Sequence, residues 1–412
     1  MAVETPEADA GVKRLSPAPA LAPARSRESI PAELTRSEVC DVAGIAALKK
    51  DYERLQSATG NVLPFALYEW HLTWCRHFLN IRPAVEDQPR FLVLRDTAGL
   101  CVAIIPLIVS RRRVGPLKFA SVGLLGADPA ITEIRGALVM PGYEQSAARA
   151  VRASLNDMPG WDWVQWTGTT HWLAALLPEK HTKPRASRQS YVLDLPPTWD
   201  MFRAGLKRNI RESLRHCYNS LKRDGHAFEL HIVTEASDVR QALDGFLALH
   251  VSRAGMQGTT VHPNRFASEV SQRFLYDVCT RLAERGVLRI FQLKVGAEIV
   301  AMRIGFVVAG GLYLYYSGYD PAWAKYSVMT TTVAEAIKYA IAQGLNTVNL
   351  SPGTDVSKTR WGPRVEEHPV VYEYSRRLAS RVAAKIYVAA VYGNGFPSWV
   401  AKRLAPARRR WD

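Results

Sequence analysis

The chain lacks any long hydrophobic run. Its longest unbroken apolar stretch, from Cys101 to Val109, is nine residues long, whereas a helix needs about 20 apolar residues to cross a bilayer. The N-terminal segment is rich in alanine, proline and charge, without an apolar core of signal-peptide length. We therefore expect a cytoplasmic protein whose residues 1–37 form a disordered leader.

Paired cysteines are missing as well. An odd number of cysteines is scattered along the chain with no CxxC spacing, namely Cys40, Cys75, Cys101, Cys217 and Cys279. This pattern argues against a disulfide framework and against a zinc site, and it fits a reducing compartment. We expect no bound metal.

The motifs of several enzyme classes are absent. There is no GxSxG elbow, no HExxH and no GxGxxG after an opening strand. The segment LSPGTDVSKTRWGP, from Leu350 to Pro363, looks like a phosphate loop, but Pro352 and Ser357 occupy the glycine positions of GxxxxGK[ST]. Proline has no N–H to donate to a phosphate. A nucleotide-hydrolysing loop is thus excluded, and the glycine loop with Lys358 needs another explanation.

Acidic residues are in the minority. The chain has 53 Lys and Arg against 38 Asp and Glu, a net charge of +15, which indicates either an anionic partner or a basic solvated surface. Apolar residues three or four apart predict one long amphipathic helix from Trp199 that ends at Gly225. Its other side, the basic face, carries Arg203, Lys207, Arg208, Arg211, Arg215, Lys222 and Arg223. This face is either solvated or a contact for an anionic ligand or nucleic acid.

Hydrophobic periodicity indicates the same order of elements twice. At 412 residues the chain is long enough for two or three domains. The first half predicts two helices over 41–80 and then a hairpin around the turn DTAG. The second half predicts helices, three strands joined by tight turns over 287–318, a helix over 327–344 and a short strand TVNL. Such a repeat indicates a duplicated α/β unit.

This order, with the residues inside it, resembles the GNAT superfamily of acyltransferases. The residues of these segments are similar to those of CelD/BcsL-type proteins, whose domain is called BioF-like acetyltransferase and is related to Fem-type aminoacyl transferases. The matching segments run in family order over roughly 60–365: PFALYEWHLTWCRHF, LKRNIRESLRHCYNSLKRDG, FLALHVSRAGMQG, LKVGAEIVAMRIGF, YYSGYDPAWAKYSV and NLSPGTDVSKTRWG. The order of these segments, rather than any one of them, is the specific signal.

The resemblance implies an α/β (α+β) fold of tandem GNAT-like units, each a mixed, mainly antiparallel sheet flanked by helices. The expected boundaries are 38–190 for the N-terminal unit, 191–378 for the catalytic unit and 379–412 for a basic amphipathic tail. The implied activity is transfer of an acyl group from acyl-CoA, or a carrier thioester, to an amine or hydroxyl. The implied acceptor is a small molecule or glycan precursor in bacterial exopolysaccharide, cellulose or cell-envelope biosynthesis.

In such folds the donor lies in a splay between two central strands, and the next helix points its N-terminus at the pyrophosphate. The resemblance therefore assigns donor binding to Tyr316, Ser327, Val328 and Met329. Val328 and Met329 stand where family members commonly have Pro-Gly, and the CoA signature [RQ]xxGx[GA] is absent. Two alternatives therefore stay open: an aminoacyl-tRNA donor, and a non-catalytic scaffold of a polysaccharide-synthesis complex.

Acyl transfer requires positioning, a proton acceptor and stabilisation of an oxyanion. The catalytic candidates are His250 as base, Tyr319 as proton donor to the leaving thiolate, and Asp320 at a strand end. Each has a structural alternative: a core histidine, strand packing, and a turn or helix-cap residue.

Four residues are candidates for substrate binding. Arg253 and Lys358 suit a phosphate or carboxylate, and Gly353 shapes the loop before the lysine. Trp361 is either a platform for a sugar or a lid on the core. The tail, with Trp399, Trp411 and three arginines at 408–410, is either a packed terminal helix or a contact for an anionic inner-membrane surface near a polysaccharide synthase.

Overall fold

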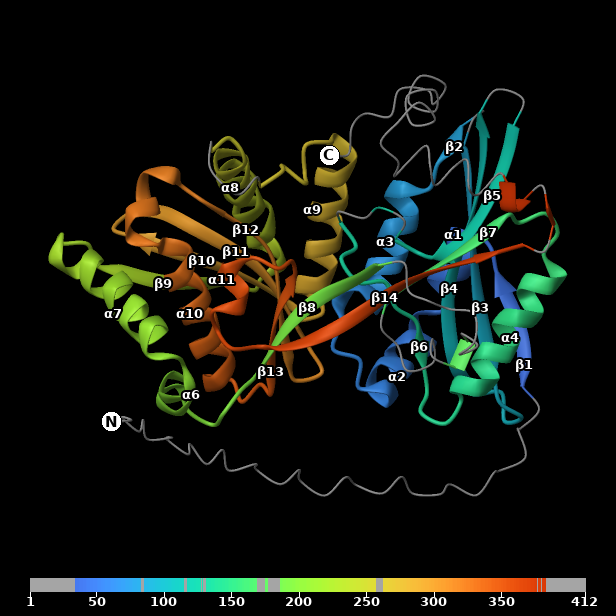
Figure 1. Ribbon diagram of the computed structural model, residues 1–412, viewed down its shortest axis with the longest axis horizontal. Coiled ribbons are helices and arrows are strands. Elements are labelled where there is room, and N and C mark those ends of the chain that lie inside the picture. Colours follow the sequence, from blue (N-terminus) through green and yellow to red (C-terminus); the bar gives the residue numbers. More distant parts are fainter. Residues whose placement is uncertain are drawn as a thin grey trace, which may run out of the picture.

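Helices cover both faces of one large mixed sheet (Figure 1). This computed structural model describes residues 34–382 except 83–84, 115–116, 127, 129–130, 169–174, 177–185, 257–261, 376 and 379. The basic tail and most of the expected leader lie outside these residues. The leader was expected to reach residue 37, but β1 (Thr35–Val39) already pairs with the next long strand along the chain.

The first half of the chain supplies eight described strands and a helical layer. The other strands are β2 (Ile81–Arg82), β3 (Val85–Arg95), β4 (Cys101–Val114), β5 (Leu117–Leu124), β6 (Leu138–Val139), β7 (Trp163–Thr167) and β8 (Ala186–Asp194). The helices are α1 (Val42–Ala47), α2 (Lys49–Thr59), η1 (Pro64–Ala66), α3 (Tyr68–Phe78) and α4 (Glu144–Asp157). β3 and β4 form the predicted hairpin. In its turn the Asp96 carboxylate accepts the N–H groups of Ala98 and Leu100.

The second half contains the predicted meander and the predicted long helix after it. Its elements are α6 (Trp199–Gly205), α7 (Arg208–Arg223), β9 (Phe228–Val233), α8 (Ala236–Ala254), α9 (Glu269–Glu284), β10 (Leu288–Val295), β11 (Glu298–Val308), β12 (Gly311–Tyr319), η2 (Pro321–Tyr326), α10 (Val328–Ala342), β13 (Thr347–Pro352), α11 (Val356–Thr359) and β14 (Arg364–Tyr374). β10, β11 and β12 pair antiparallel in sequence.

The prediction of one continuous helix after Trp199 was wrong. The chain leaves helical geometry at Leu206 and Lys207, whose ψ angles are 149° and 147°, so that two helices, α6 and α7, follow each other. Gly205 ends the first helix without the stabilisation that a residue with Cβ would add. Leu206 stays buried through the break, and the apolar spacing therefore continues although the helix does not.

The sheet topology shows two similar units that exchange a strand. The order is β1-β3-β4-β5-β7-β14-β8-β13-β12-β11-β10-β9, with β2 beside β3 and β6 beside β4. In each half an antiparallel series ends in a parallel pair, β5 with β7 and β12 with β13. β14, from the second half, then pairs with β7, and β8, from the first half, pairs with β13. β8 and β14 pair with each other and cross between the halves (Figure 1). The predicted boundary at residue 190 lies inside β8.

One hydrophobic cluster joins the halves. Helix α3 of the first half packs against α9 of the second, and residues of both helices belong to the same buried core. Two side-chain pairs cross this contact: Arg285 donates to Glu69 at 2.7 Å, and His77 lies 3.0 Å from Asp277. On the opposite face of the second-half sheet, α6, α7 and α10 cover a separate apolar cluster. The expected mixed α/β fold is confirmed.

Candidate active site

The central strands β12 and β13 separate after a short parallel contact. Their pairing stops at Tyr313 and Asn349, although β12 continues to Tyr319 and β13 to Pro352. On its other side β12 bulges, because Leu314 pairs with Gly305 while Ser317 pairs with Arg303. A bulge bends its strand and leaves backbone groups outside the ladder. Backbone N–H and C=O groups of β12 beyond Tyr313 therefore have no β13 partner across the gap.

Helix α10 begins directly after β12 and η2. As in any α-helix, its first N–H groups have no intrahelical acceptor, so this end attracts anions. Ser327 stands before the helix in a left-handed conformation, with φ 53°. The side chain of Val328 is buried in a core cluster, and Met329 packs against the same cluster. Their side chains thus pack into the protein, which removes the sequence-based objection to a phosphate approaching this backbone.

Arg360 adds a cation to the first turn of α10. Its guanidinium donates to Ser213 Oγ at 2.6 Å and lies 3.4 Å from Thr330 Oγ1. Nothing in the local sequence distinguished this arginine, because the contact joins α7, α10 and the segment after α11. The predicted donor residue Tyr316 lies apart from this end, half-buried on β12 against Phe266 and Tyr315.

Lys358 lies deep beside the splayed strands. Its ammonium donates to Ser351 Oγ at 3.1 Å and to the carbonyl of Pro352, and Asp355 Oδ2 is 3.9 Å away. Burial lowers the pKa of Lys358 to about 8, although Glu133 and Asp355 oppose that shift. Lysines with pKa values lowered in this way exchange protons near neutral pH.

The loop around Gly353 is built for this lysine. Gly353 has a φ of 124°, and a Cβ at this position would lie 3.0 Å from Lys358 Nζ. Ser351, two residues earlier, also has a positive φ, 68°, and its N–H donates to Asn349 Oδ1 at 2.8 Å. Strained backbone of this kind is common at functional sites. The structure thus brings the predicted residues Gly353 and Lys358 together.

Two arginines, Arg253 and the buried Arg303, lie close enough to Lys358 for their charges to lower its pKa. Arg253 from α8 donates to Ser317 Oγ at 2.7 Å and lies 3.1 Å from His262 Nε2. Arg303 from β11 donates to the carbonyl of Leu314 at 3.2 Å. Burial, and next the charge of Arg253, lowers the pKa of Arg303 to about 10. The sequence pointed to Arg253 but not to Arg303, which stands among apolar residues in the middle of β11.

The first half of the chain contributes a carboxylate to this cluster. Tyr313 Oη donates to Glu133 Oε2 at 2.7 Å, and Tyr315 Oη donates to the carbonyl of Ile131 at 2.6 Å. Burial raises the pKa of Glu133, while Lys358 lowers it. The opposite side of this loop is tied to α3, because Trp70 Nε1 donates to Thr132 Oγ1 at 3.1 Å. Glu133 was not predicted, since it is 180 residues from Tyr313 in sequence.

Within the described residues, none of the three catalytic candidates forms a hydrogen bond or ion pair with Lys358. His250 is buried, with Nδ1 2.9 Å from the carbonyl of Ser317 and Nε2 accepting the N–H of Arg265 at 3.3 Å. Burial lowers the pKa of His250, so a neutral imidazole with both nitrogens engaged links three segments. Asp320 caps η2 by accepting the N–H of Ala322 at 2.9 Å, the structural alternative considered for it. Tyr319 donates to the sulfur of Met256 at 3.2 Å. Catalysis by these residues stays a prediction.

Trp361 is buried in the core. Its ring stacks on Phe202 with centroids 6.5 Å apart, and Nε1 donates to the carbonyl of Ser357 at 2.9 Å. A buried ring leaves no open face for a sugar, so the platform role is wrong and the tryptophan is a lid on the core. Its place beside α11 still anchors the segment that carries Lys358.

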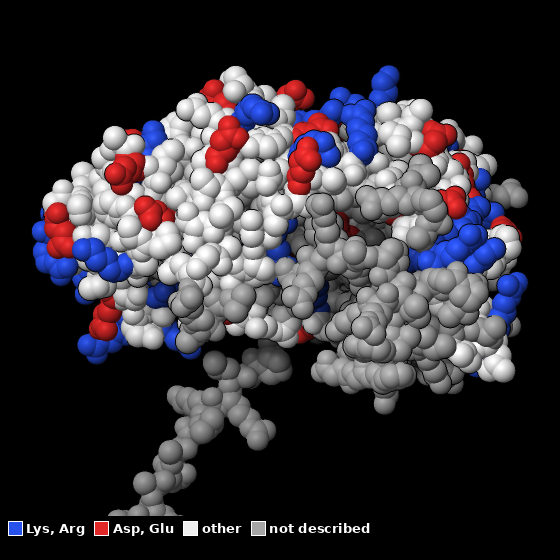
Figure 2. All heavy atoms as spheres, turned by 90° about the horizontal axis from the view of Figure 1, so that it is seen from above, with Lys and Arg blue, Asp and Glu red and all other residues white. Residues whose placement is uncertain are grey.

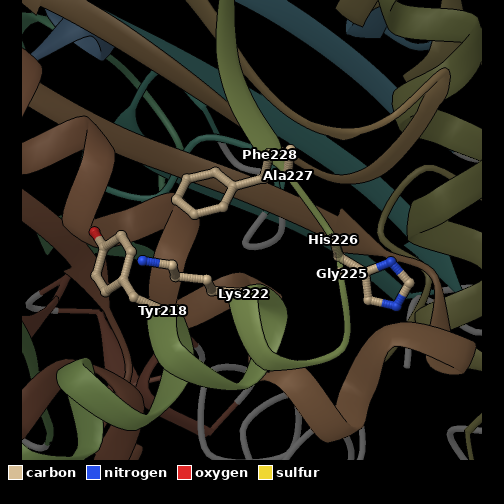
Figure 3. A pocket seen from close by; sticks show the side chains of 6 residues that line it. All are labelled: Tyr218, Lys222, Gly225, His226, Ala227 and Phe228. Carbon is tan, nitrogen blue, oxygen red and sulfur yellow. The ribbon is translucent and has the colours of Figure 1, made fainter.

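A separate pocket of about 390 Å³ lies where α7 turns into β9, lined by Tyr218, Lys222, Gly225, His226, Ala227 and Phe228. Tyr218 and Lys222 project toward Phe228, whereas His226 points away from them (Figure 3). The pocket contains none of the predicted catalytic, donor-binding or substrate-binding residues. On the face seen in Figure 2, the surface is hollowed near the middle of the molecule, and Lys or Arg atoms are visible there.

The comparisons with known proteins agree with this geometry. The family model described as "Acetyltransferase (GNAT) domain" matches residues 208–359, the segment that contains the splay, α10 and Lys358. This match identifies an acyltransferase domain and confirms the expected enzyme class. No curated protein matches the sequence.

Several solved structures are similar to this chain at low sequence identity. FemX is 12% identical and aligns over 81% of this chain and 98% of its own with a TM-score of 0.54. A tandem GNAT protein from the clavulanic acid biosynthesis pathway is 11% identical, over 82% of this chain and 98% of its own, with a TM-score of 0.41. The L-PGS of Bacillus licheniformis is 14% identical over 84% and 96%, with a TM-score of 0.45. The FemX likeness shows a shared fold over most of both chains.

Two properties of the described residues complete the site. None of their helices is both long and apolar enough to cross a membrane. Within the same residues, no three His, Cys, Asp or Glu side chains gather as ligands for a metal ion. The described residues of the site supply backbone groups, hydroxyls, two carboxylates and several cations.

Proposed function

We propose that the protein transfers an acyl group from acyl-CoA, or a carrier thioester, to an amine or hydroxyl of a small molecule or glycan precursor. The observation that carries this proposal is the splay of β12 and β13 followed directly by the N-terminus of α10. A thioester carbonyl in the splay would receive backbone N–H groups of β12. The phosphates of the donor would meet the first turn of α10 and Arg360.

Lys358 supplies proton transfer in this proposal. The neutral amine, available because burial lowers its pKa to about 8, removes a proton from the acceptor as the acceptor attacks the thioester carbon. The tetrahedral oxyanion is stabilised by β12 N–H groups. The C–S bond then breaks, and the Lys358 ammonium returns its proton to the departing thiolate. Acyl product and free thiol result, with the lysine restored.

The setting proposed for this reaction is bacterial exopolysaccharide or cell-envelope biosynthesis. Support comes from the likeness of the sequence segments to CelD/BcsL-type proteins, which stays a prediction. Association with the inner-membrane surface or a polysaccharide synthase depends on the basic tail, residues 379–412, and is proposed from sequence alone. Truncation of the tail, followed by vesicle sedimentation, tests this association.

Binding of the donor is the first experiment. Acetyl-CoA and longer acyl-CoAs are titrated into the purified full chain by calorimetry, and thiol release is followed in the same samples. We expect donor binding and thiol release, with release strongly reduced in Lys358→Ala. The matched control Lys49→Ala removes an exposed lysine of α2 and should behave as wild type. Absence of binding by every acyl-CoA would refute the donor assignment.

Aminoacyl-tRNA is the second candidate donor, and the basic face of α7 favours it. Within the described residues, Arg203, Arg208 and Arg223 of this face form ion pairs, whereas Lys207, Arg211, Arg215 and Lys222 form none within 4.0 Å. Nucleic-acid binding through such a face depends steeply on salt. RNA binding that weakens sharply with salt, together with no acyl-CoA binding, would favour this donor. A protein with neither donor would be a non-catalytic scaffold.

A further inference from the structure

Arg303 is an unusual residue for its place. It lies on the central strand β11 between Met302 and Ile304, both fully buried, and its own exposed fraction is 8%. One terminal nitrogen donates to the carbonyl of Leu314, while the buried Nε atom has no hydrogen-bond partner among the described residues. A buried charge without a partner carries a large desolvation cost.

Arg253 repeats this arrangement beside it. Its terminal nitrogens contact Ser317 and His262, and its Nε is also buried without a partner among the described residues. Ser317, which accepts the hydrogen bond from Arg253, pairs in register with Arg303 across the sheet, and the charge of Arg253 helps to lower the pKa of Arg303. Gly318 on β12 allows helix α8 to lie close to this strand, because a Cβ at position 318 would lie 2.5 Å from the backbone nitrogen of His250.

The nearby carboxylates do not neutralise these arginines. Glu133 accepts a hydrogen bond from Tyr313, and Asp355 caps α11 through the N–H of Ser357 at 3.0 Å. Within the described part of the chain, neither Arg253 nor Arg303 has a carboxylate oxygen within 4.0 Å. With Lys358 the cluster holds three cations against two carboxylates, so one positive charge is left without compensation.

We propose that Arg253 and Arg303 together bind an oxyanion, a carboxylate or phosphate, that belongs to the acceptor. A planar guanidinium suits a two-oxygen anion because its N–H groups form a fork, and each arginine keeps a free Nε for this purpose. The acceptor is then a molecule with an anionic group on one side and the reacting amine or hydroxyl on the other. Lys358 and Glu133 lie in the same cluster, where they can face the reacting group.

This inference rests on the proposed function at one point only, where the molecule that contains the anionic group is identified as the acyl acceptor. The anion site itself can be tested without any donor. An anion site also explains why the chain bears the desolvation cost of Arg303. For packing alone, an apolar residue at position 303 would fit the surrounding strand better. Retention of a buried Arg303 next to a partly buried Arg253 is expected where an anion compensates them.

Calorimetric titration of the full chain with inorganic phosphate and, separately, with acetate tests the proposal at constant ionic strength. We expect wild type to bind at least one of the two anions at a single site. Binding of phosphate alone identifies a phosphorylated acceptor, and binding of acetate alone identifies a carboxylate. Arg303→Met should weaken that binding by about 10- to 100-fold, the effect of losing one hydrogen bond to a charged group.

Two further variants keep the test decisive. Arg253→Lys retains the charge but loses the planar fork, and should weaken anion binding if Arg303→Met fails to fold. The control Arg273→Met removes an exposed arginine of α9 that pairs with Glu269 and should bind as wild type. The proposal is overturned if neither anion binds, or if both site variants bind as tightly as wild type. Thiol release from acyl-CoA, followed separately, reports whether the proposed function itself fails.

Discussion

Lys358 provides the sharpest test of the proposed chemistry. Burial is the largest cause that lowers the pKa of its ammonium to about 8, and its side chain is only 13% exposed. A lysine with this pKa is about one-tenth neutral at pH 7 and about nine-tenths neutral at pH 9. If the neutral amine removes the acceptor proton, kcat/KM should therefore rise about tenfold over this range.

Thiol release from acyl-CoA, followed between pH 6 and about 10, measures this profile. Lys358→Arg keeps a cation that does not titrate in this range, so its residual activity should lose the inflection. Lys49→Ala, on the exposed surface of α2, should keep it. A wild-type profile without an inflection near pH 8, or the same inflection in Lys358→Arg, would show that this lysine is not the base.

The same pKa has a consequence for folding with a definite sign. Because the folded pKa of about 8 lies below the ordinary 10.5, the unfolded chain binds more protons between these values. The unfolding free energy should therefore increase with pH across that window and be independent of this group below it. The shift corresponds to about 3 kcal/mol. Urea unfolding at both ends of the window should show this increase in wild type and a smaller one in Lys358→Met.

Three further outcomes follow from the neighbouring contacts. Glu133→Gln removes a charge that raises the pKa of Lys358, so the inflection in the rate profile should move to lower pH. An inflection at the same pH would show that Glu133 does not influence the pKa of Lys358. Gly353→Ala should lower stability by about 1–3 kcal/mol and reduce thiol release, because its φ is 124° and Lys358 Nζ is close. The control Gly142→Ala also has a positive φ, but with open space around it, and should affect stability alone. His250→Ala should cost about 1–3 kcal/mol in urea unfolding, since it leaves a buried carbonyl and N–H unpaired; a large loss of kcat at unchanged stability would instead support the catalytic role.

Local sequence was a good guide where packing and periodicity coincide. The hairpin of β3 and β4, the meander of β10 to β12 and helix α10 all have one apolar face or a buried run, bounded by turn residues. The break between α6 and α7 was not predicted, because a buried Leu206 is compatible with a continuous helix as well as with an interrupted one. Trp361 illustrates the same limit, since an aromatic residue in a glycine loop is equally compatible with a ligand platform and with core packing.

The candidate site was predictable only in part. Gly353 and Lys358 share one loop, and Arg253 follows His250 by one helical turn, so short-range patterns pointed to them. Arg303 and Glu133 gave no such signal. The first is a charge between apolar neighbours in the middle of β11, and the second comes from the other half of the chain to meet Tyr313.

The sequence by itself determined the element types, the duplicated order and the glycine loop that carries the lysine, because these depend on residues close together in the chain. Only the tertiary structure decided the exchange of β8 and β14 between the halves and the meeting of Glu133, Arg253, Arg303 and Lys358. Both the strand exchange and the charge compensation depend on contacts between segments that are distant in the sequence. A one-dimensional pattern carries no record of which segments will bury Lys358 or which charges will share its site. Burial is the largest cause that lowers the pKa of Lys358, and the neighbouring charges modify it.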